Sequence, residues 1–214
     1  MVRRIPNVRL GLPAGRTPLG MYRRLIQLHR TERLDFSRVR LFHLDEYLGI
    51  RSDNPNSFKS YLFREFFNLI NVRRANIYLI DENYEQTIRE AGGIDLLILG
   101  IGANGHLAFN EPGSPLDSRT RVVQLADSTI ERAKRVFGSH DLPHEAITVG
   151  VGTIMDARRI MLMASGTEKA AILAKTFSEP VSAAVPASIL QSHPSVTVIA
   201  DEDAIRLYQD SAVS

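Results

Sequence analysis

Short runs of apolar residues alternate with longer stretches in which apolar positions recur every three or four residues. The continuous runs predict buried β-strands. The most apolar of them, Ile94–Leu99, is typical of a strand that is covered on both faces of a parallel sheet. We expect strands at residues 8–12, 39–44, 76–80, 94–99, 121–125, 160–164 and 196–199.

The stretches between these runs predict helices with one apolar face. Thr17-Pro18 opens the first helix, because threonine is a good N-cap and proline suits the first helical position. Asn56 or Ser57 caps a second helix, whose apolar side carries Phe58, Tyr61, Leu62, Phe66 and Leu69. We expect further helices at 83–91 and 166–177, and a polar helix or lid segment at 128–137. Gly92-Gly93 ends the helix at 83–91.

This alternation predicts one α/β domain that spans residues 1–214. We expect a single doubly wound, Rossmann-like, mostly parallel sheet with helices on both faces. In such folds ligands bind beyond the carboxyl ends of the strands. The loops 13–17, 45–56 and 100–113 leave predicted strands at that edge and carry chemically useful residues. Their convergence is the main structural prediction.

Composition excludes several classes of function. Lys and Arg number 26 against 24 Asp and Glu, and there is no basic stripe with interleaved aromatic residues, so we expect no nucleic-acid partner. The chain has no cysteine, which excludes disulfides and thiolate metal sites and fits a cytoplasmic location. No stretch is apolar enough to span a membrane or to serve as a secretory signal.

The loop 100–113 combines glycines with an acid–base pair. A His106 imidazole with Glu111 as its carboxylate partner is a candidate proton shuttle, since the carboxylate raises the basicity of the ring and fixes its tautomer. A purely structural turn is the alternative. A metal site ranks low, because His106 lacks a second histidine at ligand spacing.

The loops 13–17 and 45–56 each have a structural interpretation as well as a functional one. The 13–17 turn joins a strand to a helix, where free N–H groups and the helix dipole suit a phosphate, but a simple helix cap also explains it. Asp45 and Glu46 end a strand, where a carboxylate is either a general base or a turn cap. We interpret His43 as a satisfied core or sheet histidine.

From about Leu10 to Ala200 the chain resembles the glucosamine-6-phosphate deaminase family, also called glucosamine-6-phosphate isomerase. The related 6-phosphogluconolactonases share the glycine-rich loop but differ after its histidine, and here Phe109-Asn-Glu-Pro112 favours the deaminases. The motifs that carry the resemblance lie at residues 11–20, 44–49, 100–112, 118–121 and 148–157.

The resemblance implies a reaction without a cofactor or metal. Glucosamine 6-phosphate and water become fructose 6-phosphate and ammonia. His106, supported by Glu111, would help to open the sugar ring, and Asp45 would move a proton from C2 to C1. The implied phosphate contacts are Gly15, Thr17, Arg135 and Lys169. Arg135 lies in a segment of about 125–148 that acts as a lid in the family.

The chain departs from the family pattern at Asn104, at Arg16 and in the allosteric site, and each departure leads to an expectation. Asn104 stands where some members have Asp, and an amide would orient His106 or the substrate rather than relay a proton. Arg16 replaces a small residue and would either strengthen phosphate binding or crowd the site. In the family's allosteric site Ser114 and Arg121 fit, whereas others do not, so we expect no activation by N-acetylglucosamine 6-phosphate. The positions that do not fit are Pro115, Val123 and Gln124.

The family's usual N-terminal strand–helix unit is absent ahead of the strand at 8–12, so we expect a trimmed or mis-started chain, or one stabilised by self-association. Monomers and ring-like hexamers both occur in the family. Three other functions stay open. They are deamination or isomerisation of another amino-sugar phosphate such as galactosamine 6-phosphate, lactone hydrolysis, and sugar-phosphate binding without catalysis.

Overall fold

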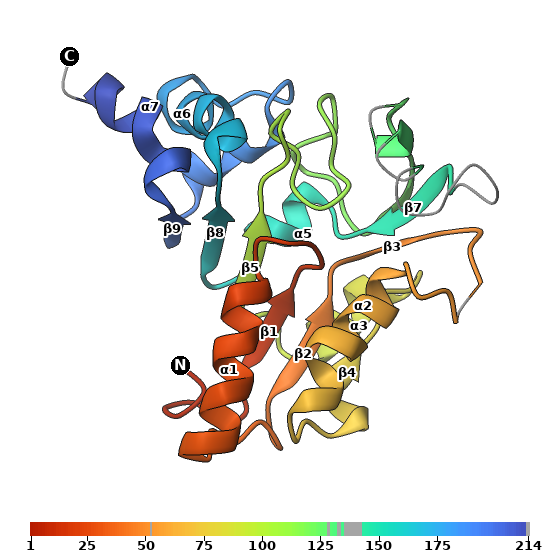
Figure 1. The fold of residues 1–214 in the computed structure, drawn as a ribbon. Coiled ribbons are helices and arrows are strands. Elements are labelled where there is room, and N and C mark those ends of the chain that lie inside the picture. The colour runs from red at the N-terminus through yellow and green to blue at the C-terminus, as the bar shows by residue number, and fades with distance from the viewer. Residues whose placement is uncertain (52, 128, 132–133, 135–142, 213–214) are drawn as a thin grey trace.

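A six-stranded parallel sheet forms the centre of the computed structural model, which describes residues 1–51, 53–127, 129–131, 134 and 143–212. The strand order is β4-β2-β1-β5-β8-β9 (Figure 1). The strands are β1 (Arg9–Leu12), β2 (Arg40–His43), β4 (Ile77–Tyr78), β5 (Leu96–Gly100), β8 (Ile160–Ala164) and β9 (Val196–Ala200). This sheet confirms the predicted α/β fold class.

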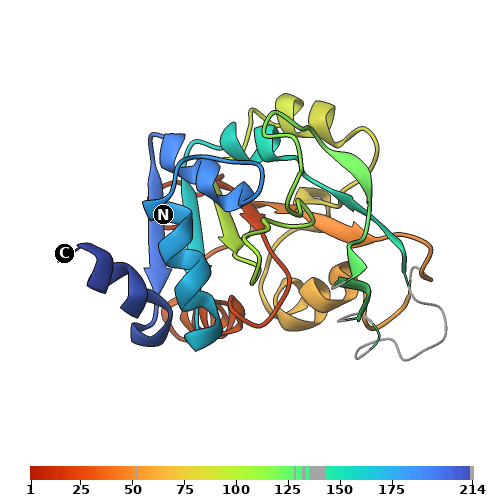
Figure 2. The same ribbon diagram turned by 90° about the horizontal axis from the view of Figure 1, so that it is seen from above.

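Helices cover both faces of the sheet. Viewed from above, α1 and α2 lie on one side of it and α3 and α5 on the other (Figure 2). The helices are α1 (Leu19–Glu32), α2 (Phe58–Glu65), α3 (Tyr84–Glu90), α5 (Val151–Met155), α6 (Ala170–Ser178) and α7 (Glu202–Ala212). Helices α6 and α7 pack against each other beside β8 and β9.

The direction of winding reverses between β1 and β5. Strand β1 pairs with β2 on one side and with β5 on the other. Gly11 permits this close packing, since a Cβ atom there would lie 2.2 Å from Cδ1 of Leu97. The reversal point is where ligands bind in open α/β sheets, so the sequence positions after β1, β2 and β5 come together at a favourable edge.

A second, three-stranded antiparallel sheet lies beside the carboxyl edge, with the order β3-β7-β6 (Figure 1). Its strands are β3 (Asp45–Tyr47), β7 (Glu145–Thr148) and β6 (Arg121–Gln124). The strand predicted at 121–125 therefore exists but stays outside the parallel sheet. The expectation of an open loop over 45–56 was wrong at its start, because β3 pairs with β7, about a hundred residues later in the chain.

The two predicted side-chain caps can be compared with the structure. Ser57 caps α2, with its Oγ accepting a hydrogen bond from the backbone N–H of Ser60 at 3.0 Å. The predicted cap at Thr17 was wrong, since α1 begins at Leu19 with Pro18 at the cap position and no side-chain cap bond. The predicted helix at 128–137 falls largely outside the described residues.

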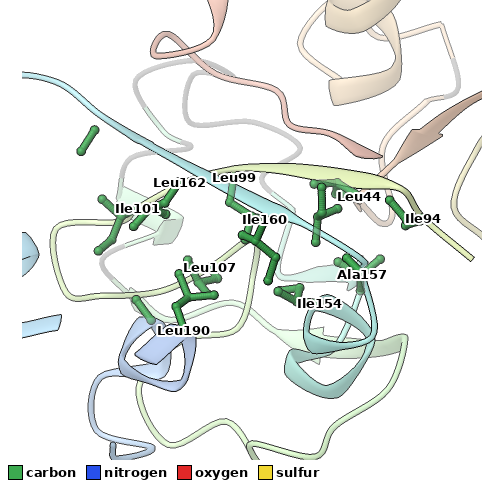
Figure 3. Packing of buried hydrophobic residues seen from close by; sticks show 14 of the residues in the cluster. Leu44, Ile94, Leu99, Ile101, Leu107, Ile154, Ala157, Ile160, Leu162 and Leu190 are labelled. Carbon is green, nitrogen blue, oxygen red and sulfur yellow. The ribbon is translucent and has the colours of Figure 1, made fainter. Parts of the chain in front are cut away.

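The loop after β5 is anchored in the core beneath it. Ile101 and Leu107 are buried together with Leu190 and with Leu99 of β5 (Figure 3). Burying a leucine or isoleucine side chain contributes roughly 1.5–3 kcal/mol. The apolar positions of this loop therefore fix its path, so that its polar residues are presented from a rigid base.

Candidate active site

The 13–17 turn joins β1 to α1 with several backbone N–H groups left free. Among the described residues, none accepts a hydrogen bond from the N–H groups of Ala14, Gly15, Arg16 or Thr17. Gly15 has a φ of +105°, which favours glycine. The Thr17 hydroxyl also has no partner among the described residues, which weakens the interpretation of this turn as a simple helix cap. These groups lie at the positive end of α1 and suit an anion.

Asp45 begins β3, one residue beyond the end of β2, and its side chain is buried. No described residue donates a hydrogen bond to its carboxylate. Burial, with a smaller effect from the charge of Glu46, raises the pKa of Asp45 to about 8. An unbonded, buried carboxylate with a pKa near neutrality has the properties of a general base.

Glu46 has a different role from its neighbour. Its carboxylate accepts hydrogen bonds from the backbone N–H groups of Tyr47, Phe58 and Lys59 at 2.8–3.0 Å. Two of these donors belong to the first turn of α2, where a carboxylate is favoured by the helix dipole. Glu46 therefore fixes the start of α2, and Asp45 is left available for chemistry.

The glycines of the loop 100–113 make room for the His106 ring. A Cβ atom at Gly102 would lie 2.2 Å from Cε1 and Nδ1 of His106. Gly105 has a φ of +85°, and a Cβ there would approach Cγ1 of Val185 to 2.7 Å. A larger residue at Gly102 would displace the His106 ring, and one at Gly105 would be strained and would crowd Val185.

His106, Asn104 and Glu111 form one hydrogen-bonded group. Nδ1 of His106 lies 2.7 Å from Oδ1 of Asn104 and 3.3 Å from Oε2 of Glu111. Nδ2 of Asn104 donates to the same Glu111 oxygen at 2.7 Å. Despite desolvation, hydrogen bonds and the charge of His106 lower the pKa of Glu111 to about 2. The carboxylate is therefore anionic and positioned to support a protonated imidazole.

Thr129 completes this group, although nothing in the local sequence pattern indicated it. Its buried hydroxyl donates to Oε1 of Glu111 at 2.6 Å. The two residues are 18 positions apart, and no local motif predicts such a contact. Both carboxylate oxygens of Glu111 thus have donors, which restricts the rotation of the side chain.

Packing through β7 connects Asp45 to the loop 100–113. Asp45 lies opposite Thr148 in the antiparallel sheet, and the Thr148 hydroxyl accepts a hydrogen bond from the N–H of Phe109 at 3.1 Å. The Phe109 ring stacks on Phe58 of α2 with centroids 5.7 Å apart and also contacts Tyr47 of β3. The described parts of the loops 45–56 and 100–113 therefore meet at one edge of the parallel sheet.

Of the two remaining basic candidates, Lys169 lies among the described residues and Arg135 does not. Lys169 ends a short 3-10 turn after β8, immediately before α6, so it follows a strand that neighbours β5. Arg135 lies outside the described residues, as does much of the predicted lid at about 125–148.

His43 departs from its interpretation as a satisfied core histidine. The residue is buried at the end of β2 as expected, but its Nε2 atom has no hydrogen-bond partner among the described residues. Burial and the charge of Lys59 lower the pKa of His43 to about 3. The ring is therefore neutral, which reduces the cost of leaving one nitrogen without a partner.

The described residues contain no cluster of three or more His, Asp or Glu side chains that could hold a metal ion. Within the same part of the chain, no helix combines the length and the apolar character that crossing a membrane requires.

Residues 1–199 match the family model described as glucosamine-6-phosphate isomerases/6-phosphogluconolactonase. Glucosamine-6-phosphate deaminase of Thermoanaerobacter pseudethanolicus is 44% identical over 220 residues, which cover 98% of this chain and 87% of the relative. The solved structure of a monomeric glucosamine-6-phosphate deaminase aligns with a TM-score of 0.91 at 40% identity, covering 96% of this chain and 90% of the other. 6-Phosphogluconolactonase from Trypanosoma cruzi shares the fold, with a TM-score of 0.74 at 20% identity over 96% and 86% of the two chains.

Proposed function

The chain belongs to the family of glucosamine-6-phosphate isomerases and 6-phosphogluconolactonases, and we propose that it is a glucosamine-6-phosphate deaminase. It converts glucosamine 6-phosphate and water to fructose 6-phosphate and ammonia. The observation that carries this function is similarity to deaminases along nearly the whole chain, at 40–44% identity, against 20% for the lactonase of Trypanosoma cruzi.

The geometry supports different roles for His106 and Glu111 in ring opening. The Nδ1 atom of His106 faces the amide oxygen of Asn104, so Nε2 is the nitrogen that can exchange a proton with the sugar. In our proposal His106 takes the proton of the C1 hydroxyl and returns it to the ring oxygen as the C1–O5 bond breaks. Glu111 stabilises the imidazolium form between these two events.

Asp45 performs the proton transfer on the open chain. Its carboxylate removes the proton from C2 while the aldehyde oxygen at C1 takes a proton from solvent, which gives an enolamine. Asp45 then returns its proton to C1. The nitrogen at C2 is now an iminium group. Water adds to that carbon and ammonia leaves, which gives the ketone of fructose 6-phosphate. The net change is hydrolysis of a carbon–nitrogen bond, so we place the enzyme among the hydrolases.

The phosphate group is assigned to the 13–17 turn. Free N–H groups, the Thr17 hydroxyl and the positive end of α1 support this assignment. We propose Gly15, Arg16 and Thr17 as contacts from this turn. Lys169 follows β8 at the same edge and would add a point charge. The family resemblance alone carries the assignments of Arg135 as a phosphate contact and of residues 125–148 as a lid.

The proposal also covers the cellular location of the enzyme, its pathway and its oligomeric state. Sugar phosphates carry charge and do not cross membranes unaided, so we place the enzyme in the cytoplasm, in the breakdown of amino sugars derived from N-acetylglucosamine. We propose that residues 1–214 act as one domain. The similar deaminase of known structure is described as monomeric, which favours a monomer over a homo-oligomer here. Sedimentation velocity separates the two states.

An assay of ammonia release from glucosamine 6-phosphate, without added metal, tests the function directly. Galactosamine 6-phosphate is the competing substrate, and 6-phosphogluconolactone is the control for lactone hydrolysis. Faster turnover of the galactose epimer would change the assigned substrate. Acid release from the lactone without ammonia release would contradict deamination. Stabilisation by the sugar phosphate with no product would indicate a binding module.

A further inference from the structure

Two tyrosines hold carbonyl groups of the 13–17 turn. The hydroxyl of Tyr22, on α1, donates to the carbonyl oxygen of Pro13 at 2.6 Å. The hydroxyl of Tyr61, on α2, donates to the carbonyl oxygen of Gly15. The two contacts come from different helices that pack in the same hydrophobic cluster on one face of the sheet.

These contacts determine where the neighbouring N–H groups point. The chain contains no cis peptide among the described residues, and in a trans peptide the C=O of one residue and the N–H of the next point in opposite directions. When Gly15 C=O is held toward Tyr61, the N–H of Arg16 points away from α2. The bond from Tyr22 orients the N–H of Ala14 in the same manner. Neither N–H has an acceptor among the described residues.

Gly15 is the position at which this orientation is easily lost. A glycine adopts positive and negative φ with similar ease, and a Cβ atom at Gly15 would meet nothing within 4 Å. The peptide between Gly15 and Arg16 is therefore free to flip unless another group holds it. A flipped peptide would present a carbonyl oxygen, which repels an anion, in place of a donor.

We propose that Tyr22 and Tyr61 are positioning residues that preorganise the 13–17 turn for phosphate, with Tyr61 holding the one peptide that could flip. This inference rests on the proposed function, because it takes that turn as the phosphate site. Preorganisation increases affinity by removing the free-energy cost of ordering the site when the ligand binds.

The same helix also links the phosphate turn to the general base. Glu46, next to Asp45, holds the N–H groups of Phe58 and Lys59 at the start of α2, and Tyr61 lies one turn further along. Burial raises the pKa of Tyr61 to about 12, so its hydroxyl remains a donor at neutral pH. Helix α2 thus sets the relation between Asp45 and the phosphate turn.

The variant Tyr61→Phe removes the hydroxyl and keeps the ring. We expect KM for glucosamine 6-phosphate and Kd for inorganic phosphate, from calorimetry, to rise about 3- to 10-fold, with kcat within about 2-fold of wild type. Tyr84→Phe is the matched control, because Tyr84 donates to the carbonyl of Tyr78 at 3.1 Å in a buried position away from the turn. It should leave Kd and KM unchanged.

The inference is overturned if Tyr61→Phe binds phosphate within 2-fold of wild type, or if wild type binds no phosphate. A loss of kcat with unchanged KM also contradicts it, since that pattern would place the hydroxyl in the chemical step. If wild type releases no ammonia but Tyr61→Phe still weakens phosphate binding, the proposed function fails and the positioning role stands. If wild type is active and the variant equals it, only the positioning role fails.

Discussion

The Oδ1 atom of Asn104 lies 2.7 Å from the Nδ1 atom of His106. The orientation of the amide is fixed because its nitrogen donates to Glu111 at 2.7 Å. An amide oxygen can only accept, so the proton of the neutral imidazole resides on Nδ1 and the lone pair on Nε2. The amide at position 104 thus selects a tautomer without adding a charge. Whether Asn104 orients His106 or the substrate during turnover stays a prediction.

Replacing Asn104 tests this selection. Asn104→Leu removes the acceptor at similar volume, and we expect kcat to fall by about 10-fold or more, because the ring loses its preferred tautomer. Asn104→Asp keeps an acceptor beside Nδ1 and should retain more activity than the leucine variant. Ammonia release under saturating substrate compares the three proteins. Wild-type kcat in Asn104→Leu would exclude the tautomer argument.

The Thr129–Glu111 bond predicts a second positioning effect. Thr129→Val removes the donor, so the Glu111 carboxylate is held less firmly beside Nδ1 of His106 and kcat should fall about 3- to 10-fold. Thr129→Ser should restore the wild-type kcat, because it retains the hydroxyl. The measurement is kcat above pH 8, where Asp45 is ionised.

Thr176→Val is the control for this experiment. Thr176 is also buried, and its hydroxyl donates to the carbonyl of Ile172 within α6. Its loss should leave kcat unchanged, whatever it does to stability. A wild-type kcat in Thr129→Val would show that the Thr129 hydroxyl has no effect on Glu111.

The proton transfer assigned to Asp45 makes a direct prediction. Asp45→Asn keeps the shape of the side chain and removes the base, so ammonia release should fall by at least about 100-fold. Binding of inorganic phosphate should survive, since the 13–17 turn is untouched. Calorimetry beside the ammonia assay separates the two effects. Equal activity in the variant would remove Asp45 from its role.

The raised pKa of Asp45 predicts opposite pH trends for activity and stability. A base works when unprotonated, so kcat/KM should increase as pH rises through about 8. The folded protein holds this proton at pH values where the unfolded chain, with a usual pKa of 3.8, has lost it. The stability that this group contributes is therefore complete below about pH 4 and is lost as pH rises through about 8.

The variant Asp45→Asn provides the comparison for stability. Its stability relative to wild type should increase from about pH 4 to about pH 8, since only wild type must bury a charge. Each 1 kcal/mol of difference raises Tm by roughly 2–4 °C in a chain of this size. Thermal unfolding of both proteins across this range measures it. A constant difference in Tm would mean that the folded protein does not raise the pKa of Asp45.

Local signals in the sequence were sufficient for the central strand and its loop. The apolar run Ile94–Leu99 and the glycines that follow it correspond to β5 and to the turn that holds His106. Ser57 caps α2 because a serine at that position bonds to a backbone N–H only three residues away. Interactions of this range are encoded in neighbouring residues, so they can be read without tertiary structure.

Contacts between distant segments were not predictable in the same way. The pairing of β3 with β7, and the bond from Thr129 to Glu111, depend on segments that meet only after folding. Which of Asp45 and Glu46 is free also depends on folding, because α2 supplies the N–H groups that bind Glu46. At Thr17, the cap that propensity favours does not form, and Tyr22 and Tyr61 hold the turn instead.

A substitution at Arg16 distinguishes the two effects expected of this residue, which are stronger phosphate binding and crowding of the site. Its side chain is exposed on the 13–17 turn and has no partner among the described residues, so it is free to attract an anion. We expect Arg16→Ala to raise KM about 2- to 5-fold at low salt, and the difference from wild type to fade near 0.5 M salt, where screening shortens the range of exposed charges. Arg30→Ala makes the same change of charge in the last turn of α1 and should leave KM unaltered. If Arg16 instead crowds the substrate, Arg16→Ala will lower KM at every salt concentration, because a steric effect is not screened.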